Sequence, residues 1–113
     1  MAVLEKASRP AISSQWQVVK TQATAGACSI EGITLCSGSG GQAMTLADGS
    51  YNGQMALVIN SGAGGAKTVT PATIVDGSTS TAVLNNRCGL FIWVDDGSSS
   101  GWAAVYGEVD TDT

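Results

Sequence analysis

The sequence predicts an all-β protein, a compact antiparallel β-sandwich or barrel-like domain with an extended N-terminal arm. Short apolar segments recur at intervals of roughly 8–12 residues, and clusters of Gly, Asp, Ser and Asn separate them. No segment keeps the i, i+3, i+4, i+7 spacing of an amphipathic helix for about ten residues without a glycine. Residues 1–14 contain Pro10 and no sustained period, so we expect them to form the arm, with 15–113 as a single β-domain.

The expected strands begin just after the arm and continue toward the C-terminus. In order, their ranges are 16–19, 33–36, 44–46, 55–59, 68–70, 73–75, 82–84, 90–94 and 102–106. Asp-Gly steps at 48–49, 76–77 and 96–97 place a glycine where a tight turn needs a positive φ. The spacing between these steps is unequal, which argues against a true internal repeat.

The strand at 90–94 is apolar on both of its faces. Its aliphatic and aromatic residues alternate, and successive side chains of a strand point to opposite faces of the sheet. One face can fill the core, and the other needs a second layer or a neighbouring copy. We therefore predict a homo-oligomer, most simply a homotrimer. The residues predicted at its self-association interface are Phe91, Trp93, Trp102 and Tyr106.

The composition excludes several classes of function. The chain has no histidine, which is the commonest general base and metal ligand. Five basic residues against nine acidic ones give a net charge of −4, and no two basic residues are adjacent, so we expect no nucleic-acid binding. The longest apolar run is far shorter than the roughly 18 residues that cross a bilayer, so we expect no membrane insertion.

The low charge itself is informative. Only 12% of the residues are charged, which is about half the usual ~25%. Serine, threonine and glycine therefore supply most of the polar surface. Such a surface favours assembly, because few charges lose their hydration when an interface forms. The N-terminus lacks the pattern of a secretory signal, and we expect synthesis in the cytoplasm.

Two glycine-rich segments resemble phosphate-binding loops. Residues 38–43 match G-x-G-x-x-A, and residues 62–68 partly match a P-loop, but both motifs need a following helix where this pattern predicts a strand. The acidic residues at 95–96 lack the further ligands of a calcium loop, and the aromatic residues lack the polar neighbours of a sugar-binding platform. We therefore expect no cofactor, no metal and no catalytic residues, and the protein is not expected to be an enzyme.

The cysteines, Cys28, Cys36 and Cys88, are odd in number and match neither a metal-binding nor a disulfide spacing. We expect free, buried thiols. A bridge between Cys28 and Cys36 would form only in an oxidising medium.

The order of segments in the second half of the chain is informative as a whole. It reads TLADGSYNGQM at 45–55, LVIN at 57–60, a Gly-rich loop, VTP at 69–71, and FIWVDDG at 91–97 followed by GW at 101–102. This series, over about 44–107, resembles small β-modules of virion proteins of tailed bacteriophages, such as capsid decoration (cement) proteins, head fibres and tail fibres. The resemblance implies a structural protein of the virion.

Two functions are compatible with that resemblance. A decoration protein, which is a short separate chain, would bind the major capsid protein at the outer surface of the head and stabilise the assembled shell. Alternatively, a head-fibre or tail-fibre module would bind a host-surface glycan through loops such as 37–41 and 98–101. We favour decoration, with the arm on the shell. The expected contacts of the arm are Val3, Leu4 and Ile12 as apolar anchors and Lys6 and Arg9 as charge partners.

Overall fold

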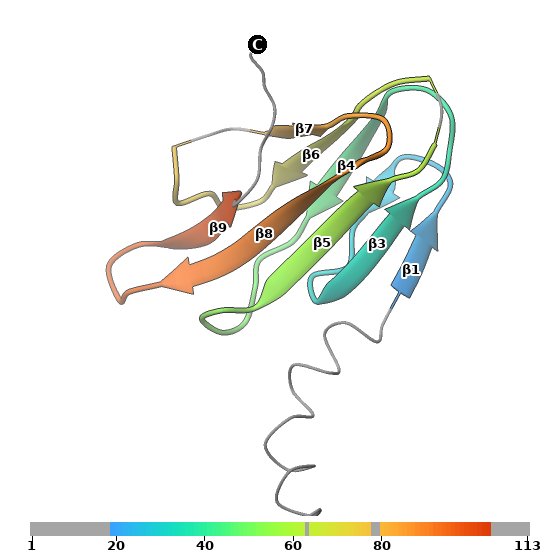
Figure 1. The fold of residues 1–113 in the computed structure, drawn as a ribbon. Coiled ribbons are helices and arrows are strands. Elements are labelled where there is room, and N and C mark those ends of the chain that lie inside the picture. The colour runs from blue at the N-terminus through green and yellow to red at the C-terminus, as the bar shows by residue number, and fades with distance from the viewer. Residues whose placement is uncertain (1–18, 63, 78–79, 105–113) are drawn as a thin grey trace, which may run out of the picture.

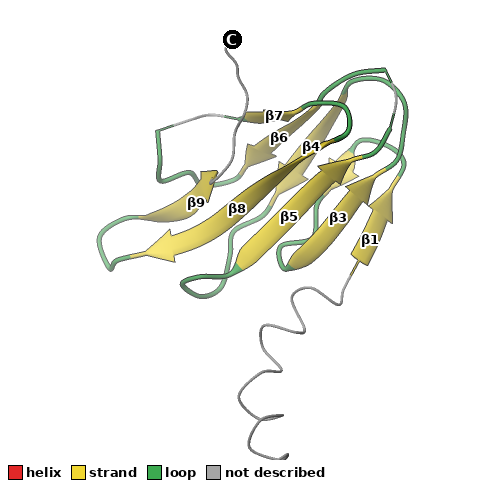
Figure 2. Ribbon diagram, in the orientation of Figure 1, coloured by secondary structure: helices red, strands yellow, loops and turns green. Residues whose placement is uncertain are grey.

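The described residues of the computed structural model, 19–62, 64–77 and 80–104, form nine strands in two sheets (Figure 1). The five-stranded sheet has the order β1 (Val19–Gln22), β3 (Gly32–Cys36), β5 (Met55–Asn60), β8 (Arg87–Asp95) and β9 (Ser100–Ala104). The four-stranded sheet has the order β2 (Gly26–Ala27), β4 (Gln42–Leu46), β6 (Lys67–Pro71) and β7 (Thr81–Val83). These residues contain no helix (Figure 2), and hence none that could cross a membrane.

The first six strands form three coils, β1 with β2, β3 with β4, and β5 with β6, and each coil contributes one strand to each sheet. The chain alternates between the sheets from β1 to β6, and each strand pairs in parallel with the strand two places along the chain. Strands β7, β8 and β9 then close the sheets with antiparallel pairs. The prediction of an antiparallel fold is therefore wrong for both sheets, which are mixed. A strand of one sheet serves as the crossover that parallel pairing in the other sheet requires, and the local alternation of residues does not reveal this.

Most of the expected strands agree with observed ones, but β1 shares only Val19 with the expected strand at 16–19, and there are two further differences. Residues 73–75 form no strand, only an isolated bridge between Ile74 and Trp102. Strand β2 was not expected, because Gly26 and Ala27 carry no alternation of apolar and polar side chains. The first expected strand, at 16–19, falls almost wholly outside the described residues.

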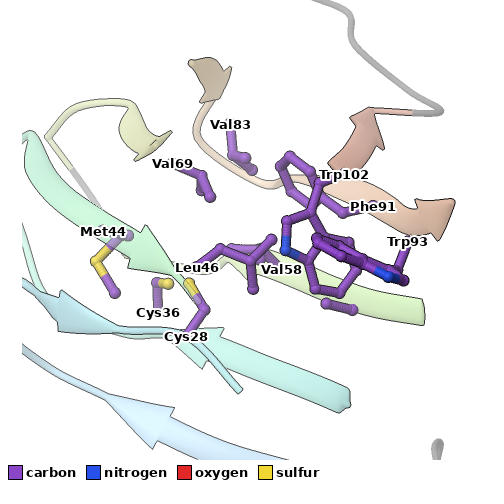
Figure 3. Close-up of a cluster of buried hydrophobic side chains, with 11 residues drawn as sticks. Cys28, Cys36, Met44, Leu46, Val58, Val69, Val83, Phe91, Trp93 and Trp102 are labelled. Atoms are coloured by element: carbon purple, nitrogen blue, oxygen red, sulfur yellow. The ribbon is translucent and has the colours of Figure 1, made fainter. Parts of the chain in front are cut away.

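The core lies between the two sheets (Figure 3). Met44, Leu46, Val69 and Val83 enter it from the four-stranded sheet, and the largest side chains enter it from β8 and β9. The rings of Trp93 and Trp102 meet edge to face, with centroids 5.4 Å apart and planes at 72°. The indole N–H of Trp102 donates to the Ala47 carbonyl oxygen at 2.8 Å, so this buried polar group is satisfied.

The loops that join the two strands of each coil, β1 to β2, β3 to β4 and β5 to β6, stack at one end of the molecule. An ideal Cβ on Gly62 would lie 1.9 Å from the Gly38 carbonyl oxygen, and a Cβ on Gly38 would lie 2.0 Å from that of Ala23. Glycine is therefore required at both positions by the close approach of one backbone to another. Side chains also join the loops: the Gln42 amide donates to the Ala23 carbonyl oxygen at 3.1 Å.

Candidate functional site

The structure corrects the predicted self-association interface. Phe91, Trp93 and Trp102 are only 1%, 6% and 1% exposed, because they fill the space between the sheets. They have no surface to offer another copy. The alternation at 90–94 identified two apolar faces, but only the second sheet decides which of them is inside. The fourth predicted residue, Tyr106, lies outside the described residues.

The opposite side of the five-stranded sheet is an aliphatic surface, which we call the outer face. Residues paired across neighbouring strands share a side of the sheet, and one such row runs Val19, Ile33, Leu57, Leu90. All four are exposed or partly exposed. The outer face comprises Val19, Thr21, Ile33, Leu35, Met55, Leu57, Ile59, Cys88, Leu90, Ile92, Val94 and Ala103. None of these residues is charged.

The outward side of the four-stranded sheet has a different character. It carries only short side chains, and the basic residue of that sheet, Lys67, points inward and is fully buried. The exposed positions of its strands are Ala27, Ala43, Thr45, Thr68, Thr70 and Ala82. The two surfaces of the domain are therefore unequal, and large aliphatic side chains gather on one of them.

A shallow hollow of about 290 Å³ interrupts the outer face near the start of β8. Its lining consists of Leu57, Asn86, Arg87, Cys88 and Leu90. Asn86 adopts a left-handed conformation with φ of 62°, which turns the chain from β7 into β8. The hollow thus combines an aliphatic floor with one positive charge at its rim.

Charged residues lie at the two ends of strand β8. Arg87 begins β8, and Asp95 ends it and is followed by Asp96. Glu31 lies at the same end as the aspartates, because it directly precedes β3, which runs antiparallel to β8 across the sheet. The backbone N–H groups of Ser99 and Ser98 lower the pKa of Asp96. One end of the five-stranded sheet is therefore acidic and the other carries Arg87.

The loops predicted for glycan binding lie at opposite ends of the five-stranded sheet, so they do not form one site (Figure 1). Residues 37–41 follow β3, whereas residues 98–101 follow β8, which runs in the opposite direction. The phosphate-loop motifs behave as expected: strands β4 and β6, and not helices, follow the glycines of 38–43 and 62–68. Neither segment provides the helix N-terminus on which those motifs depend.

All three thiols are free, and they differ in access. Cys28 and Cys36 are buried as expected, whereas Cys88 is exposed on the outer face, which corrects that expectation. Burial, and then the neighbouring Cys36, raise the pKa of Cys28 to about 12. Burial also raises the pKa of Cys36. Cys88 is thus the thiol that a reagent in solution reaches first.

The predictions about metal binding and about the N-terminal arm can be compared with the structure only in the described part of the chain. There, no group of three or more His, Cys, Asp or Glu side chains could hold a metal ion. The predicted arm contacts Val3, Leu4, Lys6, Arg9 and Ile12 all lie outside it. The alternation at 90–94 predicts a second apolar face, but the sequence assigned self-association to the aromatic side, whereas the exposed side is the aliphatic outer face. A scan against protein-family models and a search of curated proteins found no match to this chain.

Proposed function

We propose that the protein is a structural component of a bacteriophage virion, a decoration protein that binds the outer surface of the assembled head and stabilises it. The observation that carries the proposal is the uncharged, aliphatic outer face on a two-sheet domain. Each exposed Å² of apolar surface forgoes about 25 cal/mol of burial, so a face of this kind favours association. The resemblance of residues 44–107 to phage virion modules supports the same assignment.

A decoration protein would stabilise the head shell by binding alone, without catalysing a reaction. A ligand that binds only the assembled lattice lowers the free energy of that lattice relative to its dissociated subunits. We assign the contact with the major capsid protein to the arm, where Val3, Leu4 and Ile12 offer apolar anchors and Lys6 and Arg9 offer charge partners. The outer face remains available for contact between copies, in a homo-oligomer that the sequence predicts to be a trimer.

The arm and the domain can be tested separately. A variant without residues 1–12 should keep the near-ultraviolet circular dichroism of the Trp93–Trp102 pair, because both rings lie in the described core. On head particles that otherwise carry the full chain, this variant should show reduced occupancy and the particles should lose heat resistance. A matched variant, Thr68→Ser on the outward side of the four-stranded sheet, should bind as the full chain does. Undiminished occupancy of the truncated variant would show that the arm is incidental.

A reconstruction of particles that carry the protein tests the assignment as a whole. Projecting density at the head surface is the expected result. Density confined to the tail would overturn decoration in favour of the fibre module, in which the loops 37–41 and 98–101 would each have to bind glycan separately.

A further inference from the structure

We propose that Asn52 is a site of spontaneous covalent modification, in which its side-chain amide becomes a carboxylate by way of a cyclic imide, and that hydrogen bonds to strand β8 hold this reaction in check. The reacting groups belong to the chain itself, and the co-reactant is water. The inference goes beyond the proposed function, because it concerns the free protein and does not depend on binding to a particle.

The local sequence places the two reacting groups next to each other. Asn52 precedes Gly53 in the one Asn-Gly step of the sequence. The Gly53 nitrogen can attack Cγ of Asn52 with little obstruction, because glycine has no Cβ. Asn52 is exposed, and the Cβ position of Gly53 has open space around it. Water therefore reaches this step, and burial does not protect it.

The reaction proceeds in two steps. The Gly53 nitrogen loses its proton and bonds to Cγ of Asn52, while the bond from Cγ to Nδ2 breaks and ammonia leaves. A five-membered imide remains, and water then opens it at one of its two carbonyl groups. One opening gives aspartate, and the other gives isoaspartate, whose main chain contains one additional methylene. No electrons are transferred, so neither an oxidant nor a reductant is needed.

Three hydrogen bonds, which we call the clasp, hold both reacting groups against β8. Nδ2 of Asn52 donates to the Asp95 carbonyl oxygen at 2.8 Å, and the Asp95 N–H donates to Oδ1 of Asn52 at 2.5 Å. The Gly53 N–H donates to the Trp93 carbonyl oxygen at 2.9 Å. The carboxamide thus pairs with the main chain of β8 much as a neighbouring strand would. The attack on Cγ requires the clasp to open.

The clasp sets the rate of modification in the folded protein. Each of its hydrogen bonds has a modest net strength, but the three break together, so the open population falls about ten- to a thousandfold below that of the unfolded chain. Once the clasp is open, the Gly53 nitrogen is as free to attack as it is in the unfolded chain. Opening therefore limits the reaction.

The product releases the loop that the clasp held. A carboxylate only accepts hydrogen bonds, so the bond to the Asp95 carbonyl oxygen is lost and two oxygens face each other there. Isoaspartate also displaces the Gly53 N–H from Trp93 by lengthening the main chain. The same loop covers the Trp93 ring, from which a Cβ on Gly49 would lie only 2.5 Å. Modification of Asn52 therefore loosens a cover of the core.

Rates of amide loss test the proposal. The full chain is incubated in mildly alkaline buffer, either native or unfolded in guanidinium chloride, and mass spectrometry of its peptides measures the acid formed at each asparagine. In the native chain Asn52 should react about ten- to a thousandfold more slowly than in the unfolded chain. Equal rates in the two states would overturn the control by β8. In the unfolded chain Asn52 should react before the asparagines that precede residues with side chains, Asn60, Asn85 and Asn86. Earlier reaction at one of those three would overturn the assignment of the site.

Amide hydrogen exchange tests the clasp independently. The Gly53 N–H should be protected by the same factor as Asn52, to within about threefold, because exchange and attack both need the Gly53 nitrogen to leave the Trp93 carbonyl oxygen. Free exchange at Gly53 in a chain whose Asn52 stays intact would overturn the clasp as the cause of protection.

Two variants test the effect of the product. Asn52→Asp reproduces the product in its ordinary linkage and should speed exchange of the Gly53 N–H about tenfold, because one donor to Asp95 is lost. Asn85→Asp is the matched control, since Oδ1 of the exposed Asn85 accepts from the Gly65 N–H at 3.2 Å and a carboxylate can accept the same bond. This control should leave exchange at Gly53 unchanged. Equal exchange in the two variants would show that the product does not release the loop. Near-ultraviolet circular dichroism reports whether each variant is folded, and the rates of the unmodified chain test the proposal without either variant.

Discussion

The side-chain ammonium of Lys67 donates to the carbonyl oxygen of Gly38 at 2.7 Å, and so ties strand β6 to the loop of the preceding coil. The same ammonium donates to the Gly40 carbonyl oxygen at 2.5 Å, and Lys67 has no exposed surface. Buried charges persist where polar groups solvate them. Here the carbonyl oxygens of Gly38 and Gly40 solvate the ammonium, and these hydrogen bonds hold β6 against the loop between β3 and β4.

Lys67→Met should lower the free energy of unfolding by about 3–5 kcal/mol, because it removes two charge-assisted hydrogen bonds and leaves the carbonyl oxygens of Gly38 and Gly40 without this donor. Denaturant unfolding measures the change. Lys20→Met is the matched control: Lys20 donates to the Ala27 carbonyl oxygen at 2.7 Å from an exposed position, and its loss should cost less than about 1 kcal/mol. Equal losses in the two variants would contradict a structural role for the buried ammonium.

Gly62→Ala should destabilise the protein by about 3 kcal/mol, because the new methyl would overlap the Gly38 carbonyl oxygen and force the stacked loops apart. Gly77→Ala separates this effect from backbone strain. Gly77 has φ of 86° and open space around its Cβ position, so alanine there should cost only ~1 kcal/mol. Thermal unfolding of both variants gives the comparison. A Gly62→Ala protein as stable as Gly77→Ala would mean that the loops do not approach this closely.

Trp102→Phe should destabilise the folded chain by ~2 kcal/mol while leaving self-association unchanged. The substitution removes the hydrogen bond to Ala47 and leaves a small cavity beside Trp93. Unfolding and sedimentation measured on the same sample separate a core residue from an interface residue. Weaker association with undiminished stability would restore the interface role that the sequence suggested for Trp102.

Stability should fall as the pH rises above about 9. The pKa of Cys28 is raised from its ordinary value of 9.0 to about 12, so the unfolded chain ionises this thiol in a range where the folded chain keeps it protonated. The contribution of the protonated Cys28 thiol to the free energy of unfolding is therefore complete below pH 9 and is lost progressively between pH 9 and about 12. Cys36 acts in the same direction. Denaturant midpoints from pH 8 to 11 should decline less steeply in Cys28→Ala than in Cys88→Ala. Parallel declines would contradict the burial of the Cys28 thiol.

Thiol reactivity should distinguish the cysteines at neutral pH. In dilute native protein an aromatic disulfide reagent should modify Cys88 rapidly, whereas Cys28 and Cys36 should react only after unfolding. Rapid modification of Cys28 in the native state would show that the region between the sheets opens readily.

Strand positions and turns were accessible from the sequence because their causes are local. Alternation at 55–59 and 90–94 predicts strands whose side chains point to two faces, and the structure contains β5 and β8 there. The Asp-Gly steps at 76–77 and 96–97 predict a positive φ, and Gly77 and Gly97 have φ of 86° and 93°, whereas Gly49 of the step at 48–49 does not have a positive φ. The absence of helix from the described residues follows from the same local patterns.

Pairing and burial were decided only by the tertiary structure. Whether β3 pairs with β5 in parallel or with its sequence neighbour in antiparallel depends on the path through the other sheet, on which the residues of β3 carry no information. Likewise, Phe91 and Trp93 point inward because the second sheet leaves room for rings there, and Gly49, whose Cβ would lie 2.5 Å from the Trp93 ring, supplies part of that room. Alternation shows that a strand has two faces, and packing against distant segments determines which face water meets.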